Sequence, residues 1–152
     1  MKSLRNPEQK QELLRRIAAF RQTNTRLWGR MSAHQMICHL TDGYRLYLGE
    51  IPCTPMAAPA IVKAMVRTVA LYGPWPHGKV PTHPAIDQID GTGTSPCEFS
   101  SDVNALCEIL ERFMKIPQDY RWDHPGLGPL TYSQIMRLGY RHADHHLRQF
   151  GA

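Results

Sequence analysis

The chain has 152 residues, of which 42% are hydrophobic and 20% are charged, and its formal net charge is +5. This size and composition predict one compact domain over residues 1–152. No stretch approaches the roughly 20 consecutive apolar residues of a membrane span, and the first residues lack the apolar run of a signal peptide. We therefore expect a cytoplasmic protein with no membrane partner.

The cysteine spacing argues against a zinc knuckle or a small secreted domain, and the scattered basic residues argue against a nucleic-acid-binding protein. Cys38, Cys53, Cys97 and Cys107 are too far apart for a Cys-x-x-Cys zinc knuckle or for the framework of a small secreted domain. The positive charge favours contact with anions, but the lysines and arginines are scattered and form no run of five. A solvated surface explains most of this charge, so nucleic-acid binding ranks last among the functions considered.

Two helix starts can be read in the first third of the chain. Asn6 followed by Pro7 is typical of a capped helix start, and apolar residues then recur at helical spacing, which predicts a helix over residues 7–23. Ser32 and Gln35 form a capping box, which predicts a second helix over residues 33–48.

The rest of the chain predicts a long connection and further helices. A short helix is expected from about residue 59. The prolines and glycines between Gly73 and Ser95 predict a long loop, of the kind that often serves as a functional cover or a crossover. An amphipathic helix begins at Ser100 or Ser101 and ends before Pro117.

The C-terminal region is expected to be a loop over residues 119–129, followed by a last helix. The capping box of Thr131 and Gln134 marks the start of that helix, which runs to the chain end. No strand-like alternation competes for more than a few residues. The predicted class is all-α, a four-helix bundle with a long crossover loop and a short extra helix.

Three histidines fall where an ordinary bundle has apolar residues. His142 and His146 are four residues apart, which stacks their imidazoles on one face of the last helix, and helical spacing makes that face the buried one. His39 lies on the inward face of the second helix, and Gly43, one turn on, leaves space beside it. Unpaired polar groups are costly in a core, so we predict that His39, His142 and His146 share a metal ion.

Three neutral imidazoles leave at least one coordination position for water or substrate, as in a catalytic site. The expected cofactor is a divalent metal, with zinc first and nickel second, although iron and manganese accept the same ligands. His145 lies nearer the edge of the apolar stripe and is assigned to the surroundings of the metal or to the surface. His34, in the first turn of its helix, is expected to be exposed, and His124 is expected in a turn. The sequence also offers four residues that could orient the ligands or lie elsewhere: Asp42, Tyr44, Asp144 and Gln149.

The series His124-Pro125, Gly128-Pro129-Leu130-Thr131 and His142 to Phe150, with the early histidine, resembles an uncharacterised branch of the DinB-like (YfiT-like) superfamily of metalloenzymes. The resemblance spans most of the chain. It implies a four-helix bundle with a divalent metal held by His39, His142 and His146. It also implies either transfer of a low-molecular-weight thiol to an electrophile or hydrolysis. The loop from Gly73 to Ser95 departs from shorter members, so the fold carries over better than the reaction.

These observations lead to one preferred function and several alternatives. The preferred function is a metal-dependent enzyme that acts on a small molecule, with a low-molecular-weight thiol as the expected cosubstrate. A metal-dependent hydrolase is the second enzyme reading, and a non-catalytic metal- or ligand-binding stress-response bundle is the reading outside enzymes. A homodimer is also considered, but no sequence feature locates an interface.

Overall fold

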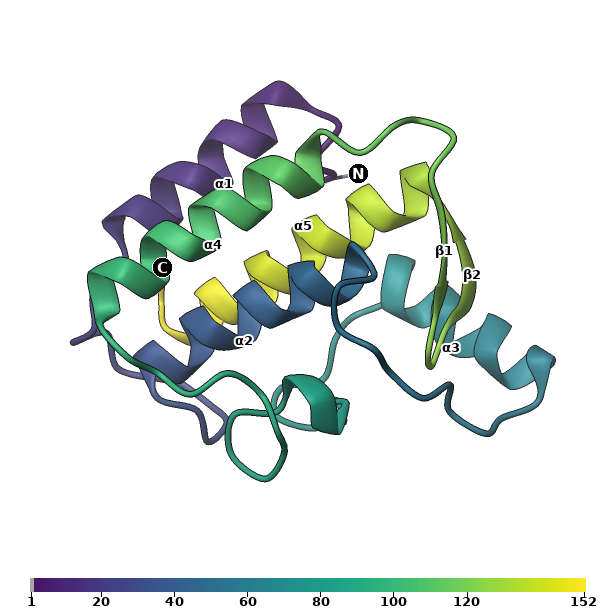
Figure 1. Ribbon diagram of the computed structural model, residues 1–152, viewed down its shortest axis with the longest axis horizontal. Coiled ribbons are helices and arrows are strands. Elements are labelled where there is room, and N and C mark those ends of the chain that lie inside the picture. Colours follow the sequence, from purple (N-terminus) through teal and green to yellow (C-terminus); the bar gives the residue numbers. More distant parts are fainter. Residues whose placement is uncertain (1) are drawn as a thin grey trace.

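The computed structural model describes residues 2–152, and this part of the chain is mostly helical (Figure 1). Two short strands, β1 and β2, pair antiparallel, with Trp122 opposite Leu130. One turn of 3-10 helix interrupts the long connection before α4. The elements are α1 (Pro7–Ala19), α2 (Ala33–Tyr47), α3 (Ala60–Tyr72), the 3-10 turn η1 (Pro84–Ile86), α4 (Phe99–Met114), β1 (Arg121–His124), β2 (Gly128–Thr131) and α5 (Tyr132–Gln149).

Local capping sets the helix starts, and three of the predicted caps are confirmed. Asn6 caps α1, and its side chain accepts from the N–H groups of Glu8 and Gln9. Both capping boxes form, Ser32 with Gln35 at α2 and Thr131 with Gln134 at α5. They satisfy backbone N–H groups that the first turn leaves without a partner, and so fix which residues face the core. The predicted cap of α4 is wrong: Glu98 is the capping residue, and its carboxylate accepts from the N–H groups of Ser100 and Ser101.

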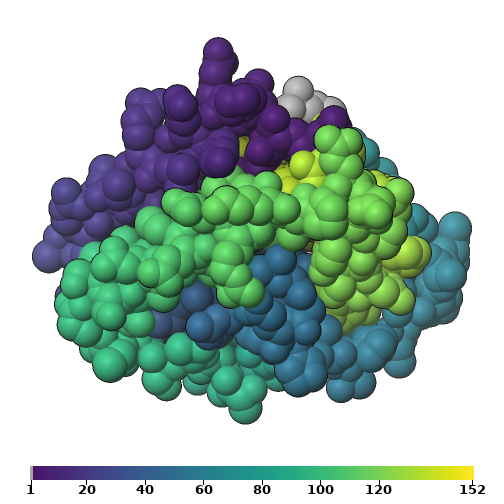
Figure 2. All heavy atoms as spheres, turned by 45° about the horizontal axis from the view of Figure 1, so that its top comes forward, coloured from purple at the N-terminus to yellow at the C-terminus, as the bar shows by residue number. Residues whose placement is uncertain are grey.

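The core lies where α2 packs against α4 and α5, with α1 closing the side formed by α4 and α5. Figure 2 shows α1 and α4 side by side, with α5 largely hidden behind them. Gly139 of α5 lets α4 approach closely, because an added Cβ would lie 2.7 Å from the ring of Phe113 on α4. The Tyr44 hydroxyl of α2 donates to the Gly139 carbonyl across 3.0 Å. These two contacts fix the position of α5 against α4 and against α2.

Two predicted boundaries are wrong. Residues 119–129 were expected to form only a loop, yet they include β1 and the first residues of β2. Each strand has only four residues, too few for alternation to be recognised in the sequence. The first helix ends at Ala19 rather than at residue 23. The next residue, Phe20, adopts an extended conformation, and its side chain enters the core.

The long connection from Gly73 to Ser95 is largely irregular and passes along α2 (Figure 1). The buried carboxylate of Asp42 holds it, accepting from the Gln88 amide at 2.8 Å and from the Thr94 backbone N–H at 2.7 Å. Asp42 therefore anchors the connection against the helix that carries His39. Among residues 2–152, no helix is both long and apolar enough to cross a membrane.

Candidate metal centre

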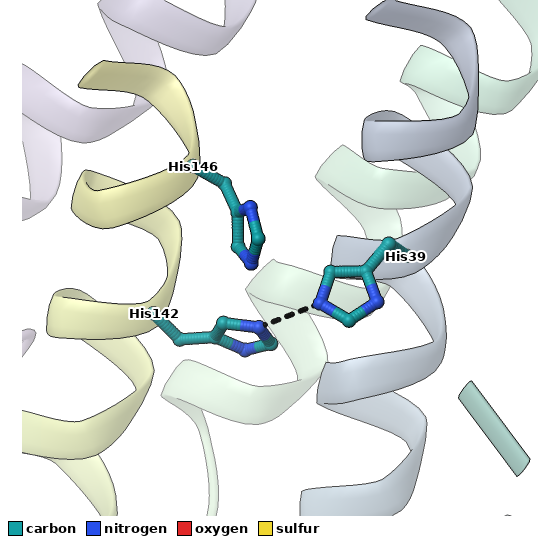
Figure 3. A group of neighbouring side chains, drawn as sticks. All are labelled: His39, His142 and His146. Atoms are coloured by element: carbon teal, nitrogen blue, oxygen red, sulfur yellow. Dashed lines mark hydrogen bonds between the residues drawn. The ribbon is translucent and has the colours of Figure 1, made fainter. Parts of the chain in front are cut away.

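His39 of α2 meets His142 and His146 of α5 between the two helices (Figure 3). Each residue offers one ring nitrogen, and these three nitrogens lie within 4.8 Å of one another. The Nε2 atoms of His39 and His142 are 3.0 Å apart. The group could hold a metal ion, as the helical spacing had suggested.

The other ring nitrogen of each histidine has its own partner. His39 Nδ1 lies 2.8 Å from the Ile86 carbonyl oxygen, which can only accept, so this nitrogen carries the proton. His146 Nδ1 lies 2.8 Å from the amide oxygen of Gln149. His142 Nδ1 lies 3.1 Å from the Tyr47 hydroxyl, which can donate or accept. These outer contacts turn each Nε2 toward the shared centre, the arrangement that metal-binding histidines usually show.

The surroundings keep the three imidazoles neutral. Burial lowers the pKa of His39 below its ordinary value. Burial also lowers the pKa values of His142 and His146 well below the ordinary value, and positive charge on a neighbouring histidine lowers them further. Neutral imidazole is the form that binds a metal ion. A cation at the centre therefore competes with no imidazolium at neutral pH. It needs only the His142 proton, which the hydrogen bond with His39 puts on Nε2, to move to Nδ1 beside the Tyr47 hydroxyl.

Two glycines make room for these side chains. A Cβ added at Gly43 would lie 2.7 Å from Cε1 of His142, so the space predicted beside His39 is used by the His142 ring. A Cβ at Gly29 would lie 2.3 Å from the Gln149 amide nitrogen, and the positive φ of Gly29, 79°, also disfavours other residues. Gln149 in turn donates to the Trp28 carbonyl across 2.8 Å. The segment before α2 therefore helps to hold His146 through Gln149.

Of the four residues considered as orienting groups, only Gln149 contacts a histidine of the centre through a hydrogen bond. Asp42 binds the long connection. Tyr44 donates to the Gly139 carbonyl. Asp144 pairs with Arg16 of α1 at 2.6 Å. Tyr47 was missed as an outer partner, although it lies eight residues after His39 on the same helix.

His145 lies outside the group of three and lines a cavity of about 280 Å³ on the flank of α5. Its ring packs 5.2 Å from that of His146, centroid to centroid, and 5.2 Å from that of Trp75. Burial, with some repulsion from His77, lowers the pKa of His145 to about 4. The cavity is lined by Trp28, Gly73, Pro74, Trp75, His77, Arg141, Asp144, His145 and Arg148.

Of the two remaining histidine predictions, the one for His34 is wrong and the one for His124 is confirmed. His34 is not exposed as expected: only 9% of it is accessible, because α4 packs over it and Asp102 binds its Nε2 at 2.7 Å. His124 does lie at a turn, where its Nδ1 accepts from the N–H groups of Gly126 and Leu127. Burial, and secondarily His83, lowers the pKa of His124 to about 4.

The fold and the centre define a mostly helical protein with a group of three histidines, two buried and His146 partly buried, that could hold a metal ion. The chain belongs to the family described as "Protein of unknown function (DUF1569)", whose family model matches residues 2–152. Neither the curated proteins nor the solved structures contain a match. The resemblance to the DinB-like superfamily is therefore corrected to this family. A pair of histidines four residues apart occurs in any helix that presents two imidazoles on one face, so it does not identify a family.

Proposed function

We propose that this protein is a divalent-metal-dependent enzyme in which His39, His142 and His146 hold the ion. In this proposal α1, α2, α4 and α5 form a four-helix bundle that serves as the rigid scaffold. The observation that carries it is the outer set of contacts: Ile86, Tyr47 and Gln149 occupy the three Nδ1 atoms and leave the Nε2 atoms for one ion. The proposal also places the protein in the cytoplasm.

The ligand set favours a catalytic ion over a structural one. Three protein ligands leave a coordination position for an exchangeable group, whereas structural zinc sites use four. His145, the neighbour that could have completed such a site, lies outside the group. Neutral imidazoles suit zinc best, followed in our order by nickel, iron and manganese.

The proposed reaction is transfer of a small thiol to an electrophile. A metal ion in this centre lowers the pKa of a bound thiol or water and so supplies a nucleophile at neutral pH. The ligand group contains no carboxylate, and Asp42, the acidic residue on the same helix as His39, is engaged by Gln88 and Thr94. A thiol, with an ordinary pKa of about 8.5 against about 15.7 for bulk water, loses its proton more readily, so the lack of a nearby base favours activation of a thiol over activation of water.

The cavity on the flank of α5 is the proposed place for the rest of an anionic cosubstrate. Arg141 and Arg148 supply positive charge, and Trp28 and Trp75 supply flat apolar walls. Trp75 also lies against the centre, with its ring 6.3 Å from that of His142. This placement brings an anion and the metal position to the same end of α5.

Metal analysis of untagged protein tests the proposal. His39→Gln and His146→Gln are each expected to lose one equivalent of metal, whereas His145→Gln, on the same helix but outside the group, should retain it. Circular dichroism of the metal-free proteins shows whether the fold persists. Equal metal content in the wild type and in both ligand variants would contradict the metal centre.

Activity assays then separate the reactions. The metal-loaded protein is incubated with glutathione, bacillithiol or mycothiol and an electrophile, and separately with esters and amides in the absence of thiol. Metal-dependent loss of thiol supports the transferase. Turnover of esters or amides without thiol would instead identify a hydrolase, and tight metal binding without any turnover would favour the non-catalytic reading.

A further inference from the structure

A second group of metal-binding side chains lies on the side of α2 that faces α4, away from the three-histidine centre. His34 and Cys38 of α2 meet Asp102 of α4, and their ligand atoms all lie within 4.8 Å of one another. His34 Nε2 is 2.7 Å from Asp102 Oδ2, and Cys38 Sγ is 3.6 Å from the same oxygen. Imidazole, thiol and carboxylate thus converge on one point between two helices.

We infer that His34, Cys38 and Asp102 form a second divalent-cation site, suited to zinc, that joins α2 to α4. The inference is independent of the proposed enzyme function, since it shares no ligand with the first centre. Nitrogen, sulfur and carboxylate oxygen are the three ligand types that zinc uses in proteins. On binding, the Cys38 S–H proton passes to solvent as the sulfur–metal bond forms. The His34 proton, which faces the Asp102 carboxylate on Nε2, moves to Nδ1 so that Nε2 can bind, and the carboxylate binds without change of charge.

The distances suit tetrahedral coordination after a small adjustment. With ordinary zinc–ligand bond lengths, neighbouring ligand atoms of a tetrahedron lie about 3.3 to 3.5 Å apart. The separation between Cys38 Sγ and Asp102 Oδ2, 3.6 Å, already matches. The separation between His34 Nε2 and Asp102 Oδ2 must increase by about 0.6 Å, which a rotation of the carboxylate can supply.

Neighbouring groups hold these ligands in place. His34 and Cys38 are four residues apart, and the capping box of Ser32 fixes the helical register that puts both on one face. The backbone N–H of Cys97 donates to Asp102 Oδ2 across 3.0 Å and orients the carboxylate. The Gln22 amide nitrogen lies 3.5 Å from the other ring nitrogen of His34, and a flip of this amide presents its oxygen to the Nδ1–H that metal binding at Nε2 requires. Outer contacts of this kind position ligands in known metal sites.

A hollow in the surface lies beside the His34 ring, although none of the three ligands lines it. A cavity of about 410 Å³ is lined by Gln22 and Ala33, and Gln22 contacts His34 directly. Cys38 itself is buried, with 2% of its surface accessible. The Gln22 side of the His34 ring carries Nδ1 rather than the ligand atom Nε2, so a cation reaches the ligands only when side chains between α2 and α4 shift.

Cobalt binding distinguishes the two centres. Co²⁺ replaces zinc, and a thiolate ligand gives it a charge-transfer band in the near ultraviolet that imidazole ligands do not give. The reduced, metal-free wild type is expected to develop this band on titration with Co²⁺. Cys38→Ser should abolish the band and lower the bound cobalt by one equivalent. Cys107→Ser removes another half-buried thiol from the same helix pair and should leave the band intact.

Two further variants keep the outcome interpretable. His34→Gln is expected to raise the cobalt concentration needed for half of the band by more than about tenfold, even if Cys38→Ser folds poorly. His39→Gln should retain the band, so loss of the first centre and loss of the second give different results. A wild type without the band, or a band unchanged in Cys38→Ser, would overturn the inference.

Discussion

Single residues set the geometry of the three-histidine centre, and Gly43 is one of them. In Gly43→Ala the new methyl would lie 2.7 Å from the His142 ring, so the ring must move away from His39. We expect metal affinity to fall about 10- to 100-fold. Helical content should persist, because alanine favours a helix by about 1 kcal/mol over glycine. Isothermal titration with zinc measures the affinity, and circular dichroism of the apo protein provides the control.

Gln149 carries the second prediction at this scale. Its amide oxygen orients His146 and its amide nitrogen binds the Trp28 carbonyl, so Gln149→Leu removes both contacts. Metal affinity should again fall about 10- to 100-fold, with the metal still bound at high concentration because all three ligands remain. Gln118→Leu changes an exposed glutamine and should have no effect. An unchanged affinity in Gln149→Leu would show that His146 needs no outer partner.

The sequence predicted the residues of the centre better than their partners. His39, His142 and His146 lie on helices whose capping residues are explicit, so their faces followed from helical periodicity. The Ile86 carbonyl could not be foreseen, because a backbone group carries no side-chain signal and its position depends on the path of a long connection. His34 was placed on the surface because its contact with Asp102 joins residues 68 apart in sequence.

At the scale of elements, the capping boxes are local devices whose loss should affect stability more than metal binding. Ser32→Ala removes the side chain that accepts from the Gln35 N–H, and we expect about 0.5 to 2 kcal/mol of lost stability. Affinity at the three-histidine centre should change little, because the helix body keeps its packing against α4 and α5. Urea unfolding of the apo protein measures the loss. Ser95→Ala, at an exposed serine outside the helices, is the control.

The elements that the sequence missed are those held by nonlocal contacts. The β1–β2 hairpin pairs strands of four residues, and Trp122 on β1 packs its ring 5.5 Å from that of Tyr47. Tyr47 in turn contacts His142, so the hairpin supports the centre through one aromatic side chain. Periodicity over four residues cannot reveal this, whereas the amphipathic pattern of α4 extends over 16 residues and was recognised.

At the scale of the whole molecule, α2 is the common element. Its face toward α5 carries His39, its face toward α4 carries His34 and Cys38, and Asp42 anchors the long connection. α3 lies at the edge of the fold, where Leu71 enters the core and several other apolar side chains are exposed. The homodimer stays a prediction, and sedimentation velocity measures it directly. Concentrating so many polar groups on one helix should make stability depend on pH.

His124, at the end of β1, adds a pH dependence of definite sign. Its pKa is about 4 in the folded chain, against about 6.5 when unfolded, so between these values the unfolded state binds more protons. The stabilisation is complete above pH 6.5 and is lost as the pH falls toward 4, by about 3 kcal/mol for this group. His124→Asn keeps an acceptor for the Gly126 N–H but does not titrate. Apo His124→Asn should therefore lose less stability than the wild type between pH 6.5 and 4 in urea unfolding, and the two curves should run parallel above pH 7. Equal losses at low pH would show that His124 is not held neutral by the fold.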